Sequence, residues 1–85
     1  MKETRIIGLL ITDRIKEAGQ TQVLLTQYAH VIQSRLGFHE LSENTCSRTG
    51  IIILHLGGNA EECVRFEKAL SEVRGIEVQK MVFNH

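Results

Sequence analysis

The sequence predicts an α+β sandwich with the element order strand, helix, strand, strand, helix, strand. Two short, continuously apolar runs each break into a helix-start signal, and two later stretches carry apolar residues three and four positions apart. The 85 residues suffice for one domain with a small core, residues 1–85. Two strand–helix–strand units of about 40 residues each predict a ferredoxin-like βαββαβ fold. Both helices are expected on one face of a four-stranded antiparallel sheet.

The first unit begins with an apolar strand over residues 5–12. Asp13 then offers an N-cap carboxylate, but Gly19 weakens the early helix by ~1 kcal/mol relative to alanine, so the helix could start later. Apolar residues recur at helical spacing from Gln20 to Arg35 and predict an amphipathic helix there.

Gly37 then stands where a left-handed residue commonly ends a helix. A short, more polar strand is expected over residues 38–43 and a turn over 44–47. An apolar strand follows over residues 48–56, and Gly57-Gly58 closes it.

Asn59 with Glu62 three residues later resembles a capping box at the start of a second helix. Gly75 ends this helix, and residues 76–83 form the last strand. The apolar stripe of the second helix consists of Cys63, Phe66, Leu70 and Val73.

The two apolar strands carry large aliphatic residues at both parities, so one set must face away from the helices. Burying each such side chain stabilises by ~1.5–3 kcal/mol, and exposed patches of this kind mark contact surfaces. Two interpretations stay open: a somewhat apolar open sheet, or a homo-oligomer, dimer or tetramer, joined sheet on sheet or edge to edge. If Leu54 and Leu56 face the core, the interface contains Ile51, Ile53 and His55.

The charge balance and termini restrict the possible partners. Ten basic and ten acidic side chains are scattered along the chain, which argues against direct nucleic-acid binding. We see no signal-peptide pattern and no apolar stretch near the ~20 residues that span a bilayer, so we expect a cytoplasmic protein without membrane contact. Two cysteines without a secretory signal are expected to be reduced thiols.

Histidine and cysteine spacing does not predict a metal site or another cofactor. The chain has no Cys-x-x-Cys, His-x-His or His-x-x-x-His pattern, and Cys63 fits a buried core thiol. His30 is expected on the solvated side of the first helix. A metal held between subunits by His55 stays open as an alternative, as does a pH- or ligand-responsive His55.

No catalytic constellation is visible, so we do not expect an enzyme. The serines lack a nucleophile-elbow motif, and Asp13 is the only aspartate. Gly57-Gly58 before a helix could approach an anion but is more simply a turn. A small enzyme on a dimeric ferredoxin-like fold stays open as an alternative. It would need a cluster of polar side chains in an enclosed cavity, and only His55, Tyr28 or His30 could belong to such a cluster.

Most of the chain resembles one bacterial family, the iron-only hydrogenase system regulators. The segments that carry the resemblance are Asp13-Arg14, residues 22–38, residues 50–54 and residues 69–80. It implies a stand-alone ACT-like domain, similar in fold to the C-terminal domain of the nickel-responsive repressor, with a regulatory role that includes transcriptional regulation. Thr26 replaces a usual histidine, and His39-Glu40 replaces a Pro-Tyr-like pair. The metal-binding strand of the repressor has no counterpart, so nickel binding is not implied.

ACT-like domains bind effectors near the first strand–helix turn and between subunits. By this fold-level analogy, Asp13, Arg14 and Arg35 are the predicted ligand-binding residues, although helix capping and solvated pairing also explain the first two. We therefore expect a non-enzymatic, oligomeric regulatory domain that senses a small metabolite or binds a partner protein.

Overall fold

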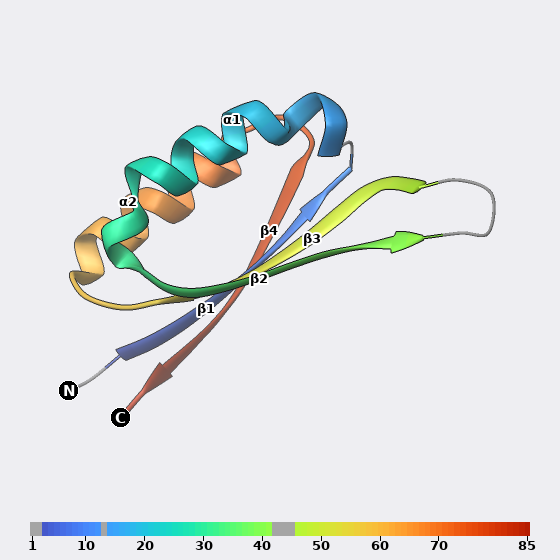
Figure 1. Cartoon of the computed structure of the whole chain (residues 1–85). Helices are drawn as coiled ribbons and strands as arrows, with labels where there is room; N and C mark the ends of the chain where they lie inside the picture. Colours follow the sequence, from blue (N-terminus) through green and yellow to red (C-terminus); the bar gives the residue numbers. More distant parts are fainter. Residues whose placement is uncertain (1–2, 13, 42–45) are drawn as a thin grey trace.

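The computed structural model describes residues 3–12, 14–41 and 46–85, with side chains placed for residues 3–12, 19–37 and 50–85. A single four-stranded sheet has the order β2-β3-β1-β4 with antiparallel neighbours, and two helices lie side by side on one of its faces (Figure 1). The α+β, ferredoxin-like prediction is confirmed. The elements are β1 Glu3–Ile11, α1 Arg14–Gln27, the 3-10 turn η1 Ala29–Val31, β2 Ile32–Leu41, β3 Cys46–Leu56, α2 Ala60–Ser71 and β4 Ile76–Asn84.

The two most apolar strands are the two central ones. β1 pairs with β3 on one side and with β4 on the other, so that Leu9 lies between Ile52 and Val78. Central strands exchange backbone hydrogen bonds on both edges, and their side chains meet a neighbour on each side. The predicted central position of the two apolar runs is therefore confirmed.

The first helix ends eight residues earlier than its predicted end at Arg35. α1 stops at Gln27, η1 follows, and β2 begins at Ile32 instead of residue 38. Val31 and Ile32 are β-branched, which favours a strand, and the helix-like spacing continues through η1 without a break in the apolar pattern. Gly37 lies within β2 and does not cap a helix.

Two further boundaries differ from the predictions. β3 already begins at Cys46, so the expected turn over residues 44–47 overlaps the strand, and residues 42–45 lie outside the described part. α2 ends at Ser71, so Val73 follows the helix instead of belonging to its stripe. Gly75 has the left-handed conformation that was predicted, with a φ of 86°, but it lies four residues beyond Ser71 and so precedes β4 instead of ending α2.

Asn59 caps α2 as predicted. Its side-chain oxygen accepts hydrogen bonds from the backbone N–H groups of Glu61 and Glu62 at 2.9 and 3.2 Å. The Glu62 carboxylate does not complete a capping box, because it pairs with the His30 ring at 2.9 Å. His30 belongs to η1, where its ring also stacks on Tyr28, and this contact ties η1 to the start of α2.

The core lies between the helices and one face of the sheet. Its members have exposed fractions of at most 3%, and Tyr28 stacks on the Phe66 ring at 4.9 Å. Cys63 is among them, so its prediction as a buried thiol is confirmed. The buried cluster consists of Ile7, Leu9, Leu25, Val31, Leu54, Leu56, Cys63, Phe66 and Leu70.

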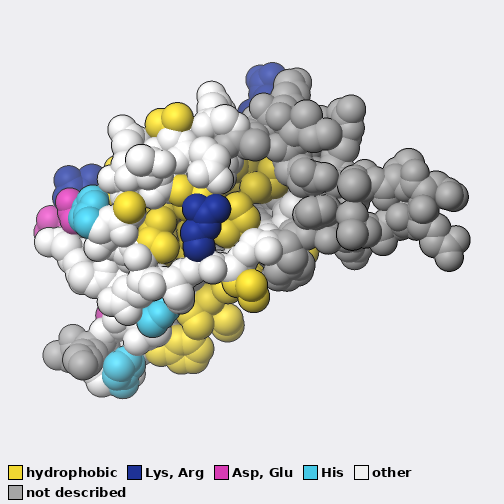
Figure 2. Space-filling model, viewed as in Figure 1, with side chains coloured by type: hydrophobic (Ala, Val, Ile, Leu, Met, Phe, Trp, Pro, Cys, Tyr) yellow, Lys and Arg dark blue, Asp and Glu magenta, His cyan; other side chains and the backbone are white. Residues whose placement is uncertain are grey.

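The opposite side of the sheet, called here the outer face, carries the side chains of the alternate residues of the same strands. Ile53 lies across from Gly8, and its Cδ1 is 3.7 Å from the position of a Cβ on that glycine. Hydrophobic side chains gather in the lower part of Figure 2, which in the same view of Figure 1 is the side of the sheet away from the helices. The apolar residues of the outer face are Ile6, Leu10, Leu36, Ile51, Ile53, Met81 and Phe83.

None of the described helices is long and apolar enough to cross a membrane.

Candidate functional site

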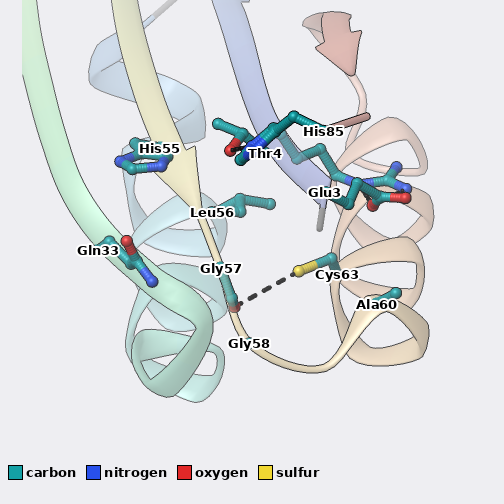
Figure 3. A pocket seen from close by; sticks show the side chains of 11 residues that line it. Glu3, Thr4, Gln33, His55, Leu56, Gly57, Gly58, Ala60, Cys63 and His85 are labelled. Carbon is teal, nitrogen blue, oxygen red and sulfur yellow. Dashed lines mark hydrogen bonds and ion pairs between the residues drawn. The ribbon is translucent and has the colours of Figure 1, made fainter. Parts of the chain in front are cut away.

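A hollow of about 520 Å³ lies at the end of the sheet where β1 begins and β3 ends. We call it the sheet-end hollow. Strands β1 and β3, the start of α2 and the last residue of the chain surround it (Figure 3). Its volume is in the range of small-molecule sites. The lining residues are Glu3, Thr4, Arg5, Gln33, His55, Leu56, Gly57, Gly58, Ala60, Cys63 and His85.

Two glycines form the wall between β3 and α2. A Cβ on Gly57 would overlap the side-chain amide of Gln33, so the missing side chain lets this amide lie directly over the backbone. Gly58 has a φ of 91°, a conformation that favours glycine. The Gly57-Gly58 pair therefore makes the predicted turn and also gives the hollow a backbone wall.

Two polar side chains of the hollow have no partner within the described part of the chain. Gln33 from β2 and His55 from β3 make no hydrogen bond or ion pair there, and they lie on the same side of the hollow in Figure 3. An amide and an imidazole can each donate and accept hydrogen bonds. Together they can hold a small polar molecule against the glycine wall.

Thr4 and His85 close the hollow at the chain ends. The Thr4 hydroxyl and the His85 Nε2 are 2.8 Å apart, although 81 positions separate the two residues in sequence. This contact holds His85 against the first strand, and the hydrogen bond itself is exposed to solvent.

An ion cluster forms the inner wall. The Arg5 guanidinium donates to Glu3 from Nε and Nη2, at 2.9 and 2.6 Å, and to Glu67 on α2 from Nη1, at 2.7 Å. Burial alone would lower the pKa of Arg5, but the hydrogen bonds to the two carboxylates outweigh burial and raise it. Arg5 therefore remains cationic and fixes β1 to α2.

Glu67 is only half satisfied by this cluster. Its Oε2 accepts the bond from Arg5, but its buried Oε1 accepts no hydrogen bond, and the Lys80 ammonium lies 3.8 Å away. An unsatisfied buried acceptor costs about 1–3 kcal/mol.

Cys63 is held as an unreactive thiol. Its Sγ donates to the Gly57 carbonyl at 3.7 Å, and burial raises its pKa. A thiolate is the nucleophilic form of cysteine, so this environment disfavours reaction at the sulfur.

The predicted ligand residues are not brought to this hollow. Arg14 begins α1 at the far end of β1 from the hollow, and Asp13 lies outside the described residues. Arg35 is exposed on β2, in register with Leu54, and has no partner in the described part of the chain.

The predicted interface residues lie where the strand parity places them. Ile51, Ile53 and His55 point to the outer face and pair in register with Leu10, Gly8 and Ile6. His55 is the one of the three that also lines the hollow, so it belongs to both surfaces. Within the described residues, no group of three or more His, Cys, Asp or Glu side chains could hold a metal ion.

Sequence reasoning missed the ion cluster and Gln33. Arg5 shares the parity of the buried Ile7, and Glu67 follows the buried Phe66. Two opposite charges on core-facing positions are a signal that could have predicted a buried ion pair. Gln33 had no such signal, because its position depends on a register shift in β2 between Ile32 and Ser34.

The fold and the hollow define a ferredoxin-like α+β domain with a polar cavity at one end of its sheet. The chain is similar in structure to the uncharacterized protein TM1266 from Thermotoga maritima, with a TM-score of 0.81 and 21% sequence identity over 98% of this chain and 100% of that chain. At this identity the similarity shows the fold alone. No protein-family model matches the chain, and no curated protein matches it.

Proposed function

We propose that this chain is a non-enzymatic, oligomeric regulatory domain that binds a small polar metabolite in the sheet-end hollow. The observation that carries the proposal is the pair of unpartnered groups, Gln33 and His55, against the glycine wall of a cavity of about 520 Å³. Both side chains come from strands of one sheet: His55 from a regularly paired part of β3, and Gln33 from the register shift in β2 between Ile32 and Ser34.

The position of His55 links the hollow to assembly. Its ring lines the cavity, and its strand position puts it on the apolar outer face beside Ile53 and Ile6. A second copy packed on the outer face would contact His55, so ligand and partner would share one side chain. Binding of one would then alter the affinity for the other by a reciprocal coupling.

A second copy is the occupant of the outer face that the surface itself favours. The centre of this face is apolar, formed by residues such as Leu36, Ile53 and Met81, and formal charge is confined to Glu77 among its placed side chains. Two such faces bury apolar surface without burying an unpaired charge. A two-fold pair is the commonest arrangement for such contacts.

Two features favour binding over catalysis. Burial keeps the Cys63 thiol protonated, and the Thr4–His85 pair is exposed to solvent. Catalytic nucleophiles usually have an activated form and a base oriented by a third group. The family resemblance to the hydrogenase system regulators agrees with a regulatory, cytoplasmic role.

A thermal-shift screen of small polar metabolites tests the ligand site. A ligand at 100 times its Kd adds about 2.7 kcal/mol of stability, and each kcal/mol raises the Tm of a domain this size by roughly 4–8 °C. Gln33→Ala and His55→Ala should abolish the shift produced by a binding metabolite. Gln22→Ala, on the exposed side of α1, is the matched control and should retain it.

A shift that persists in both hollow variants would place the ligand elsewhere. A screen in which no metabolite shifts the wild-type Tm would contradict the proposal. Titration with divalent metal ions in the same assay tests the alternative of an intersubunit metal sensor. In that case a metal ion should raise the Tm of the wild-type protein, and His55→Ala should abolish this rise.

A further inference from the structure

β4 is an edge strand with an unusually exposed second half. Met81, Val82 and Phe83 are consecutive, yet they are 55%, 37% and 49% exposed, although successive residues point to opposite faces. The pairing of β4 with β1 runs without a register shift from Asn84 to Ile76, so no bulge turns this edge away. The unpaired backbone groups of a straight edge strand are a template for pairing with another strand, and the side chains of this edge alternate between apolar residues and the polar Glu77, Gln79 and Lys80 before the apolar end.

A groove runs beside this edge, between α2 and β4. Its volume is about 500 Å³, and its lining includes Val64 and Glu67 from α2 and Val78 and Lys80 from β4. The Glu67 side chain is 10% exposed, and its buried Oε1 is the atom that accepts no hydrogen bond. The groove therefore combines an open strand edge with an acceptor that lacks a donor.

The Lys80 of the same chain does not supply that donor. Its ammonium lies 3.8 Å from Glu67 Oε1, beyond hydrogen-bond distance, and its side chain is 56% exposed. A second cation that enters from the open side of the groove would reach the same oxygen with less solvent around it.

Antiparallel pairing of β4 with its own copy provides such a cation in one register. A two-fold axis perpendicular to the sheet places residues of equal parity opposite each other. If the axis passes at Lys80, the two lysines oppose each other, which is unfavourable. If it passes at Gln79, each Lys80 lies opposite Val78 of the other copy, beside the groove that contains Glu67.

We propose that β4 pairs antiparallel with β4 of a second copy about Gln79, and that each copy's Lys80 supplies the missing donor to the other copy's Glu67. On the outer face this register sets Gln79 against Gln79 and Met81 against Glu77, with no like charges opposed. The contact is isologous and extends the sheet to eight strands. It does not depend on packing between outer faces.

Disulfide trapping across the axis tests the register. In a Cys46→Ser background, Gln79→Cys places two thiols directly opposite each other, at the Cα separation of antiparallel neighbours that a disulfide can bridge. We expect rapid formation of a covalent dimer under mild oxidation. Glu77→Cys, on the same face and strand but off the axis, is the matched control and should cross-link at least roughly tenfold more slowly, since a bond requires facing thiols.

Charge variants test the Glu67–Lys80 exchange. Lys80→Glu should slow the Gln79→Cys cross-link at least roughly tenfold because it sets a carboxylate against Glu67, whereas Lys80→Arg should retain the wild-type rate. Circular dichroism would confirm that each exposed-site variant is folded. Adding Ile53→Asp breaks packing of outer faces without touching β4, so the cross-link should persist in that variant.

Three results would overturn the inference: equal cross-linking by Glu77→Cys, an unchanged rate in Lys80→Glu, or loss of the cross-link in Ile53→Asp. The last result would assign the contact to the outer face. A folded chain that stays monomeric at millimolar concentration would also exclude a second copy as the occupant of this edge.

Discussion

The two faces of the sheet use the same apolar residue types but differ sharply in burial. On the helix side, Ile7, Leu9 and Leu54 are 0–1% exposed. On the outer face, Ile51 and Ile53 are only partly buried, and Leu10 is 37% exposed. The composition of the strands therefore does not determine burial.

The helices explain the difference. α1 and α2 have 14 and 12 residues, and both lie on the same side of the sheet. Residues such as Leu25, Phe66 and Leu70 fill the space above Leu54 and exclude water there. No helix or strand among the described residues covers the outer face in the same way. The apolar side chains of the central strands that face the helices are covered within the chain, and those of the outer face are available to a partner.

Truncating two neighbouring residues of β3, one on each face, should reveal the difference in packing between the faces most clearly. Leu54→Ala should lower the free energy of unfolding by about 2–5 kcal/mol, because it leaves a cavity in the close-packed core. Ile53→Ala should cost only about 1 kcal/mol in dilute protein, because its site is open and can be rehydrated. Urea denaturation at matched, low protein concentration measures both. Equal losses would mean that the outer face is as closely packed as the core.

Introducing a charge on the outer face should act on assembly and leave folding intact. Ile53→Asp places a carboxylate in the middle of the apolar face, where a contacting copy would have to desolvate it. We expect light scattering to show a smaller particle, with circular dichroism unchanged. Val23→Asp is the matched control, since Val23 is 60% exposed on α1, and it should keep the wild-type mass. An unchanged mass in Ile53→Asp would count against outer-face assembly.

The smallest expected effect concerns the Cys63 thiol on the helix side. Burial raises its pKa in the folded chain, so above the unfolded pKa of about 8.5 the unfolded state loses a proton that the folded state keeps. The contribution of the Cys63 thiol to the free energy of unfolding is therefore complete below that pH and decreases as the pH rises above it. Urea denaturation between about pH 7 and pH 9.5 should show this decline. In Cys63→Ala, the free energy of unfolding should decline less steeply with pH over this range. Identical pH dependences in the two proteins would contradict a raised pKa of the Cys63 thiol.

Much of the fold could be predicted because local signals agreed with each other. The apolar runs predicted the two central strands, and Asn59 predicted the start of α2. The end of α1 could not be predicted in the same way. Residues 28–32 keep a helical apolar spacing, and only pairing of β2 with β3 makes Ile32 the first residue of a strand.

The candidate site was predictable only in fragments. His55 and the Gly57-Gly58 turn were visible as separate features, but their relation to Gln33 depends on the register between β2 and β3. The contacts of Thr4 with His85 and of Arg5 with Glu67 join residues 81 and 62 positions apart. Local sequence patterns carry no information about such distances.

Three properties could be predicted from the amino-acid sequence alone: the order of the elements, the central place of the two apolar strands, and the surplus of apolar side chains that one layer of helices leaves uncovered. These properties follow from hydrophobic periodicity and capping, which act over a few residues. The tertiary structure decided which charges are buried, where the hollow lies, and which carboxylate oxygen lacks a donor. Those properties depend on strand register and on the packing of α2 against β1 and β4, which bring distant residues within hydrogen-bond distance.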